Sequence, residues 1–196
     1  MIFLKKLFGK KEKPHEVNLE TFAIIPLFNM GEGRAPFDDW KDPDIDIPPN
    51  LESLFKASVW IYQVYIFNLI AFDRFGEEIE NKIYELQLSF LEKIHSEEHA
   101  VIFDAGMNLI KRSLHRQFEN PVEKELNGEK IKLPMDWGLA MELLLFTKDS
   151  PYLAREGESA PDFEDNDTNL ALCLEHGKRS ALNYFKGGLN EITVTL

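Results

Sequence analysis

The sequence predicts a mainly α fold: a helical bundle of about five helices around a buried central helix, with a small β-hairpin or sheet element. Three observations predict it. Ala57 to Phe72 contains no charged residue, over a stretch too long for an ordinary strand. Apolar residues then recur at helical spacing between Glu77 and Ile94. An Asn127-Gly128 pair separates two short alternating segments, which is the strongest short-range signal for a hairpin.

The central helix is expected to follow an N-cap at Asn50 and to run from Leu51 to Phe72. A helix that is apolar on every side is normally buried on every side. It is also shorter than the roughly 20 apolar residues that span a membrane. We therefore expect the helix to form the core, with loss of one face to an oligomer interface as the alternative. The side chains expected to be largely buried are Trp60, Ile61, Phe67 and Leu69.

The other helices are bounded by residues that break or cap helices. Gly76 separates the central helix from a helix over Glu77 to Ile94, and Ser96 caps a third helix that runs to about Phe118. A fourth helix follows Pro134 and includes Trp137 to Phe146. The last helix is expected over Thr168 to Lys186, with Gly187-Gly188 at its C-cap.

The β element is expected to centre on a hairpin of Val122 to Leu126 and Glu129 to Leu133. Proline is dense between residues 14 and 50 and prevents a long helix there, so Thr21 to Phe28 is interpreted as a short strand or extended segment. Ile192 to Leu196 is also β-prone. We expect it to pair with the hairpin or with Thr21 to Phe28.

The chain is expected to comprise a short N-terminal segment, residues 1–13, and one globular domain over residues 14–196. The segment is basic and amphipathic, with five lysines against one glutamate, a composition that can lie weakly on an anionic membrane. No secretory signal is evident, because Lys5 and Lys6 interrupt the first apolar residues. The single cysteine, Cys173, is expected to be buried and inert, and a cytoplasmic location is expected.

The charge balance points to the class of partner. Lys and Arg total 22 against 34 Asp and Glu, a formal net charge of −12. Such a surface repels nucleic acid and attracts basic proteins. The acids concentrate in two predicted loops, which are the expected partner-binding surface. Its residues are Asp38, Asp39, Trp40, Asp42, Asp44, Asp46, Glu156, Glu158, Asp162, Phe163, Glu164, Asp165 and Asp167.

One histidine cluster supports an alternative function. His95 and His99 are four residues apart, with Glu92 and Glu98 close by. On one continuous helix the two imidazoles would share a face and could ligate a metal. A helix that begins at Ser96 would instead place the histidines on different helices. We expect no metal here, and a metal-dependent enzyme built on these residues is the alternative.

Motifs for nucleophilic catalysis or phosphate binding are not matched. No Gly-x-Ser-x-Gly sequence occurs, and Gly177 to Ser180 lacks the earlier glycine of a phosphate-binding loop. We therefore expect no catalytic residue and no cofactor. The expected function is binding: an acidic protein that neutralises a basic protein, as an immunity protein or inhibitor does. A peripheral membrane adaptor that uses residues 1–13 is a further alternative, and a homodimer is an allowed state.

Overall fold

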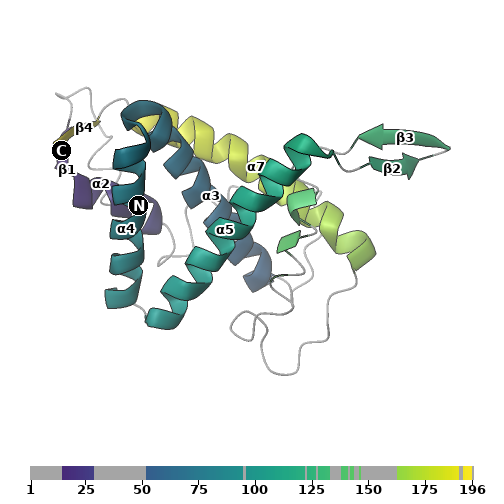
Figure 1. Cartoon of the computed structure of the whole chain (residues 1–196), viewed down its shortest axis with the longest axis horizontal. Helices are drawn as coiled ribbons and strands as arrows, with labels where there is room; N and C mark the ends of the chain where they lie inside the picture. The colour runs from purple at the N-terminus through teal and green to yellow at the C-terminus, as the bar shows by residue number, and fades with distance from the viewer. Residues whose placement is uncertain are drawn as a thin grey trace. The chain divides into compact units, whose positions relative to one another are not determined.

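Helices form most of the described chain (Figure 1). The computed structural model describes residues 15–28, 52–94, 96–121, 123–126, 128–132, 138–140, 142–143, 146, 163–189 and 192–195. The predicted mainly α fold with a small β element is confirmed. The helices are α2 (Leu19–Phe28), α3 (Glu52–Phe75), α4 (Glu77–Ile94), α5 (Glu97–Glu119) and α7 (Phe163–Leu189), and the strands are β1 (His15–Asn18), β2 (Glu123–Leu126), β3 (Glu129–Lys132) and β4 (Ile192–Thr195).

The chain forms two compact units, which are described separately. Unit 1 comprises Met1–Asp39, Gln63–Val101 and Lys178–Leu196, and unit 2 comprises Trp40–Tyr62 and Ile102–Gly177. Three long helices, α3, α5 and α7, supply residues to both units. The prediction of one domain over residues 14–196 stays a prediction.

The boundaries of α3, α4 and α5 agree with the local signals in the sequence. Gly76, with φ of 83°, ends α3 in a conformation that glycine adopts without steric cost, and α4 begins at the next residue. The Gly76 amide donates to the Phe72 carbonyl at 2.8 Å. Ser96 precedes α5, and its Oγ lies 3.4 Å from the His99 amide, the geometry of a weak N-cap. The predicted break and cap are both confirmed.

The predicted strand over Thr21 to Phe28 is wrong, because these residues belong to α2. Asn18 caps this helix: its Oδ1 accepts a hydrogen bond from the Thr21 amide at 2.8 Å. Pro26 lies inside this helix, near its end, and lacks the N–H that would donate to the Phe22 carbonyl, so the helix forgoes one hydrogen bond there. A short, uniformly apolar segment has no periodicity to separate a buried helix from a buried strand, and the dense prolines favoured the wrong choice.

The strands form two separate pairs. The hairpin of β2 and β3 is antiparallel, with Leu126 opposite Glu129 and Gly128 at φ of 81°, as predicted. The prediction that Ile192 to Leu196 is β-prone is confirmed by β4, but its predicted partners are wrong. β4 pairs in parallel with β1, and His15 lies opposite Ile192. The pairing depends on contacts between the two ends of the chain, which no local pattern encodes.

Helix α7 is longer at both ends than predicted. It begins at Phe163, so the end of the predicted acidic loop forms its first turns. Acidic residues near a helix N-terminus are favoured by the helix dipole, which is consistent with the early start. The helix also continues through Gly187-Gly188 to Leu189, so the predicted C-cap there is wrong. A side chain from α3 satisfies the terminal carbonyl instead, as described below.

The core of unit 1 is built on a cluster of packed aromatic rings. Phe67 of α3 is fully buried and packs between Phe22 of α2 and Phe185 of α7, with ring centroids 5.1 and 5.2 Å away. Phe75 meets Phe22 edge-on at 5.6 Å. Tilted and edge-on rings are favoured arrangements for aromatic side chains. Phe67 therefore connects three helices that are distant in sequence.

A buried amide pair fixes the register of α2, α3 and α4. Asn68 and Gln87 exchange two side-chain hydrogen bonds, of 3.0 and 2.9 Å, and Gln87 Nε2 also donates to the Ala23 carbonyl at 3.1 Å. Both residues are buried. Because an unpaired amide in this environment would cost free energy, the three bonds specify one alignment of α2, α3 and α4.

In unit 2, α5 packs closely against the first half of α3. The ring of Trp60 lies 5.4 Å from that of Phe103. A Cβ on Gly106 would lie 2.9 Å from Ile61 Cδ1, so the glycine allows the two helices to approach. Residues 138–140 are helical and buried, and Glu142 forms an ion pair with Arg116 of α5 at 3.4 Å. The predicted fourth helix is confirmed at these described positions, whereas Trp137 and Leu144 lie outside the described residues.

The burial prediction for α3 is confirmed in part. Ile61 and Phe67 are buried, and Trp60 is half-buried. Leu69 is 44% exposed and Phe72 is 50% exposed, so the expectation for Leu69 is wrong. An uncharged helix is exposed to solvent wherever no neighbouring element packs against it.

We predict that Phe67→Ala destabilises the fold by about 3–5 kcal/mol, because it leaves a cavity among three helices. Phe72→Ala, the same change at a half-exposed position of the same helix, should cost about 1 kcal/mol or less. Urea unfolding of both variants measures the difference. Equal losses would show that Phe67 is not the packing centre.

We predict that Asn68→Leu and Gln87→Met each destabilise the fold by about 1–3 kcal/mol, because each leaves a buried amide unpaired. The double variant should lose less than the sum of the two, since neither partner is then left alone. A double-mutant cycle in urea tests this expectation. Strict additivity would contradict the proposed coupling.

Candidate functional site

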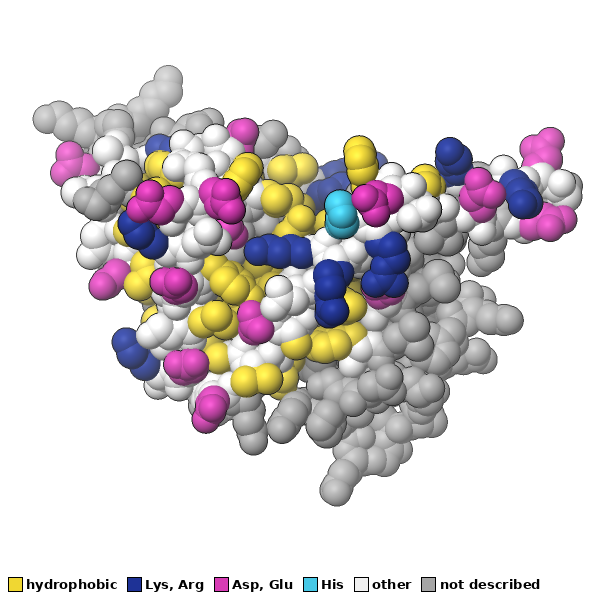
Figure 2. Space-filling view, viewed as in Figure 1, with side chains coloured by type: hydrophobic (Ala, Val, Ile, Leu, Met, Phe, Trp, Pro, Cys, Tyr) yellow, Lys and Arg dark blue, Asp and Glu magenta, His cyan; other side chains and the backbone are white. Residues whose placement is uncertain are grey.

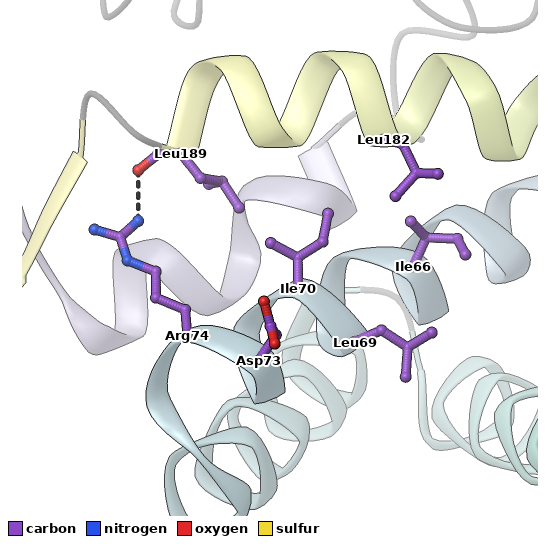
Figure 3. A pocket seen from close by; sticks show the side chains of 7 residues that line it. All are labelled: Ile66, Leu69, Ile70, Asp73, Arg74, Leu182 and Leu189. Carbon is purple, nitrogen blue, oxygen red and sulfur yellow. Dashed lines mark hydrogen bonds between the residues drawn. The ribbon is translucent and has the colours of Figure 1, made fainter.

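The candidate site is an open groove in unit 1 between α3 and α7, with a cavity volume of about 600 Å³ (Figure 3). Its lining is mainly aliphatic, and two charged residues of α3 complete it. Four of the α3 positions follow helical spacing of three and four, so they share one face. The lining residues are Ile66, Leu69, Ile70, Asp73, Arg74, Leu182 and Leu189.

Arg74 closes one end of the groove by binding two backbone carbonyls. Its guanidinium donates to the carbonyl of Leu189, the last residue of α7 (Figure 3). It also donates to the carbonyl of Ile192, at 2.7 Å. It also lies over the Phe75 ring, 4.9 Å from the centroid. The end of a helix carries unsatisfied carbonyls and a partial negative charge, which a cation stabilises. Arg74 therefore fixes the end of α7 and the start of β4 against α3.

Exposed apolar and acidic side chains continue from the groove along the chain. Leu69 lines the groove with 44% of its surface exposed, and Phe72 lies one turn further along α3. Asp73, Glu77 and Glu78 are exposed on either side of the Gly76 turn. In Figure 2 acidic side chains predominate over α4, which carries five glutamates and two lysines. Asp73 therefore places one carboxylate on the lining of the groove, and further acidic side chains lie at the Gly76 turn and on α4 of the same unit.

Two groups near this surface have shifted pKa values. Lys82 donates a hydrogen bond to Glu78, with Nζ 2.7 Å from Oε1, and this bond and the adjacent charge lower the pKa of the Glu78 carboxyl. Burial raises the pKa of the Tyr65 phenol, and the negative charge of Glu80 raises it further. Glu78 therefore stays ionised and Tyr65 stays neutral at physiological pH. Neither shift provides a group that would titrate near neutrality.

Most of the residues predicted as the partner surface lie outside the described residues. Residues 38–46 and 156–162 lie outside the described residues. Phe163, Glu164, Asp165 and Asp167 lie in the first turns of α7, as backbone only. Their assignment to a loop is wrong, whereas their role in partner binding stays a prediction.

The groove residues were missed as a site by the sequence analysis. The uncharged run of α3 indicated burial everywhere, and no local signal marks where the covering helices end. The one useful signal was Asp73, which follows Ile66, Leu69 and Ile70 on the same helical face. A charged residue on an otherwise apolar helix face indicates that this face is exposed to solvent near that residue.

The alternative metal cluster is divided by a helix break. α4 ends at Ile94 and α5 begins at Glu97, so Glu92 and His99 lie on different helices. His99 is exposed, with Nδ1 2.8 Å from Ser96 Oγ, and Glu92 is exposed near the end of α4. His95 and the side chain of Glu98 lie outside the description. Among the described residues, no three His, Cys, Asp or Glu side chains gather closely enough to hold a metal.

The burial of Cys173 argues against a nucleophilic pair of Cys173 and His176. Cys173 is buried in α7, as predicted, and His176 is half-buried three residues later. Because Cys173 is buried, its thiol is not accessible to a substrate.

Comparisons with protein-family models, with curated proteins and with solved structures found no match. One helix within the described residues, Phe55–Phe75, is long and apolar enough to cross a membrane by length and composition. In the structure, 61% of its most apolar window is buried, which is typical of a core helix. The function must therefore be inferred from the groove and the surfaces.

We predict that Arg74→Met lowers stability by about 2–3 kcal/mol, because two carbonyls lose a charged donor. Hydrogen exchange should accelerate first in β1, β4 and the last turn of α7. Arg112→Met is the control, since that arginine donates to the Asn108 carbonyl within its own helix. If the two variants show the same exchange pattern, Arg74 does not hold these elements in place.

Proposed function

We propose that this chain is a non-catalytic binding domain that captures a basic, amphipathic segment of a partner protein, as a neutralising immunity protein or inhibitor does. The observation that carries the proposal is the open apolar groove between α3 and α7, with the exposed carboxylate of Asp73 on its lining. Apolar side chains of the partner would enter the groove, and its basic side chains would face the acids.

The groove has the composition of a binding site for a peptide segment. Binding pockets are concave and mostly apolar, with a few polar groups that set orientation. Here Asp73 is an exposed carboxylate on the lining, while Arg74 already donates to two carbonyls. Asp73 is therefore the charged lining group that remains to face a ligand, and its carboxylate favours a cation. An amphipathic helix in an apolar groove is a common recognition mode.

The charge of the whole chain supports the same class of partner. A formal net charge of −12 raises the association rate of basic proteins and suppresses the approach of acidic ones. The two acidic segments, residues 38–46 and 156–167, would add to this attraction. A cytoplasmic setting is part of the proposal and follows from the single cysteine.

The test uses two synthetic helical peptides with the same apolar face, one with Lys and one with Glu on the polar face. The Lys peptide should bind and shift the methyl resonances of Ile66, Leu69, Ile70, Leu182 and Leu189. Added salt should slow association, because charges more than about 8–10 Å apart are screened near physiological ionic strength. Preference for the Glu peptide, or shifts that avoid the groove methyls, would contradict the proposal.

Matched variants separate the apolar from the electrostatic contribution. Leu69→Ser with Phe72→Ser should speed dissociation on the order of tenfold or more, as loss of apolar anchors does. Asp73→Asn with Glu77→Gln should instead slow association and weaken its salt dependence. Leu172→Ser, at a partly exposed position of α7 in unit 2, is the control. An equal effect of the control would show that the groove is not the site.

A further inference from the structure

Leu189 belongs to two structural features of unit 1 at once. Its side chain is buried and lines the groove, and its carbonyl accepts a hydrogen bond from the Arg74 guanidinium (Figure 3). The same guanidinium donates to the carbonyl of Ile192, the first residue of β4, at 2.7 Å. One side chain of α3 therefore joins the α7 wall of the groove to β4. The α7–β4 strap is defined here as Leu189 together with β4.

A closed series of contacts runs from the strap back to α3. β4 pairs in parallel with β1, and β1 leads directly into α2. α2 packs Phe22 against Phe67 of α3, which lies about two helical turns before Arg74. The groove wall, both strands and α2 are thus connected through one stretch of α3.

The strap has the properties of a segment that opens locally. Strands β1 and β4 have four residues each, and in the part of the chain that the structure describes they form a sheet of two strands. A pair of short strands is marginally stable by itself. Gly187 and Gly188 lie in the last turn of α7, and glycine is unfavourable inside a helix. Such segments open at a lower free energy than the whole fold, so the two hydrogen bonds from Arg74 contribute directly to closure of the strap.

We propose that Arg74 is a positioning residue that couples binding in the groove to closure of the α7–β4 strap. This coupling rests on the proposed function, in which a basic amphipathic segment enters the groove. Opening of the strap would move Leu189 out of the lining and remove apolar surface that the segment contacts. A ligand that binds only the closed form stabilises that form by mass action. Binding and closure therefore favour each other by the same factor.

Arginine suits this position because its planar guanidinium presents several N–H donors and can reach two carbonyls at once. The bond to Leu189 holds the groove wall, and the bond to Ile192 holds β4, so the coupling needs both. A lysine would keep the favourable positive charge at the end of α7 but lacks the planar arrangement of donors.

The experiment is hydrogen exchange of the full chain with and without the helical Lys peptide described above, while the groove methyl resonances report binding. At a peptide concentration of about ten times Kd, exchange in β1 and β4 should slow by about tenfold, because the opening equilibrium falls by the factor 1 + [L]/Kd. The hairpin of β2 and β3 in unit 2 is the matched control, since it is also a pair of four-residue strands. Its exchange should not change.

Variants of Arg74 separate positioning from charge. Removal of a cation from the groove lining would, by charge alone, strengthen the binding of a basic peptide. The coupling predicts the opposite: Arg74→Met should raise the Kd of the Lys peptide by about fivefold or more, and Arg74→Lys should recover part of the loss. Arg112→Met, which removes a cation from unit 2, should leave the Kd unchanged. The coupling is wrong if Arg74→Met binds the peptide as tightly as the wild type does.

Val194→Gly tests the coupling without a ligand and without a change in the groove lining. It removes a β-branched side chain from β4, so exchange of the β4 amides should accelerate by about fivefold. The methyl resonances of Leu182 and Leu189 should shift in the same variant, because the groove wall moves with the strap. Methyl resonances that stay in place would overturn the coupling.

The coupling and the proposed function fail in different ways. If the peptide shifts the groove methyl resonances but leaves exchange in β1 and β4 unchanged, the coupling is wrong and the proposed function stands. If the peptide does not shift the groove methyl resonances, the proposed function is wrong, and the result with Val194→Gly decides the coupling. The same variant and the wild-type exchange decide it if Arg74→Met does not fold.

Discussion

The uncharged run of α3 is the constraint on which the rest of the structure depends. A helix without a charged side chain from Ala57 to Phe72 must be covered by other elements, since its exposure would leave a large apolar area in water. In unit 1 the covering elements meet at Phe67 and Asn68, which contact α2, α4 and α7. In unit 2, α5 covers the first half of α3 at Trp60 and Ile61. The groove in unit 1 lies where neighbouring elements leave part of the α3 surface exposed.

Hydrogen bonds of polar groups select one alignment of the helices, which apolar burial alone does not specify. The amide pair of Asn68 and Gln87 permits one alignment of α2, α3 and α4, because any slip would leave buried donors and acceptors unpaired. Arg74 does the same for the end of α7 and the start of β4. As a consequence, Leu182 and Leu189 of α7 face Ile66 and Ile70 of α3 across the groove (Figure 3).

The sequence by itself determined the elements that depend on neighbouring residues. Gly76, Ser96 and the Asn-Gly turn act within a few residues, so the helix boundaries and the hairpin could be predicted. Only the tertiary structure decided that Thr21 to Phe28 is a helix, that β4 pairs with β1, that α7 passes through Gly187-Gly188, and that Leu69 is exposed. These outcomes depend on residues far apart in the chain. Arg74, for example, reaches carbonyls more than a hundred residues away, and no local periodicity records which face of an apolar helix its distant neighbours leave uncovered.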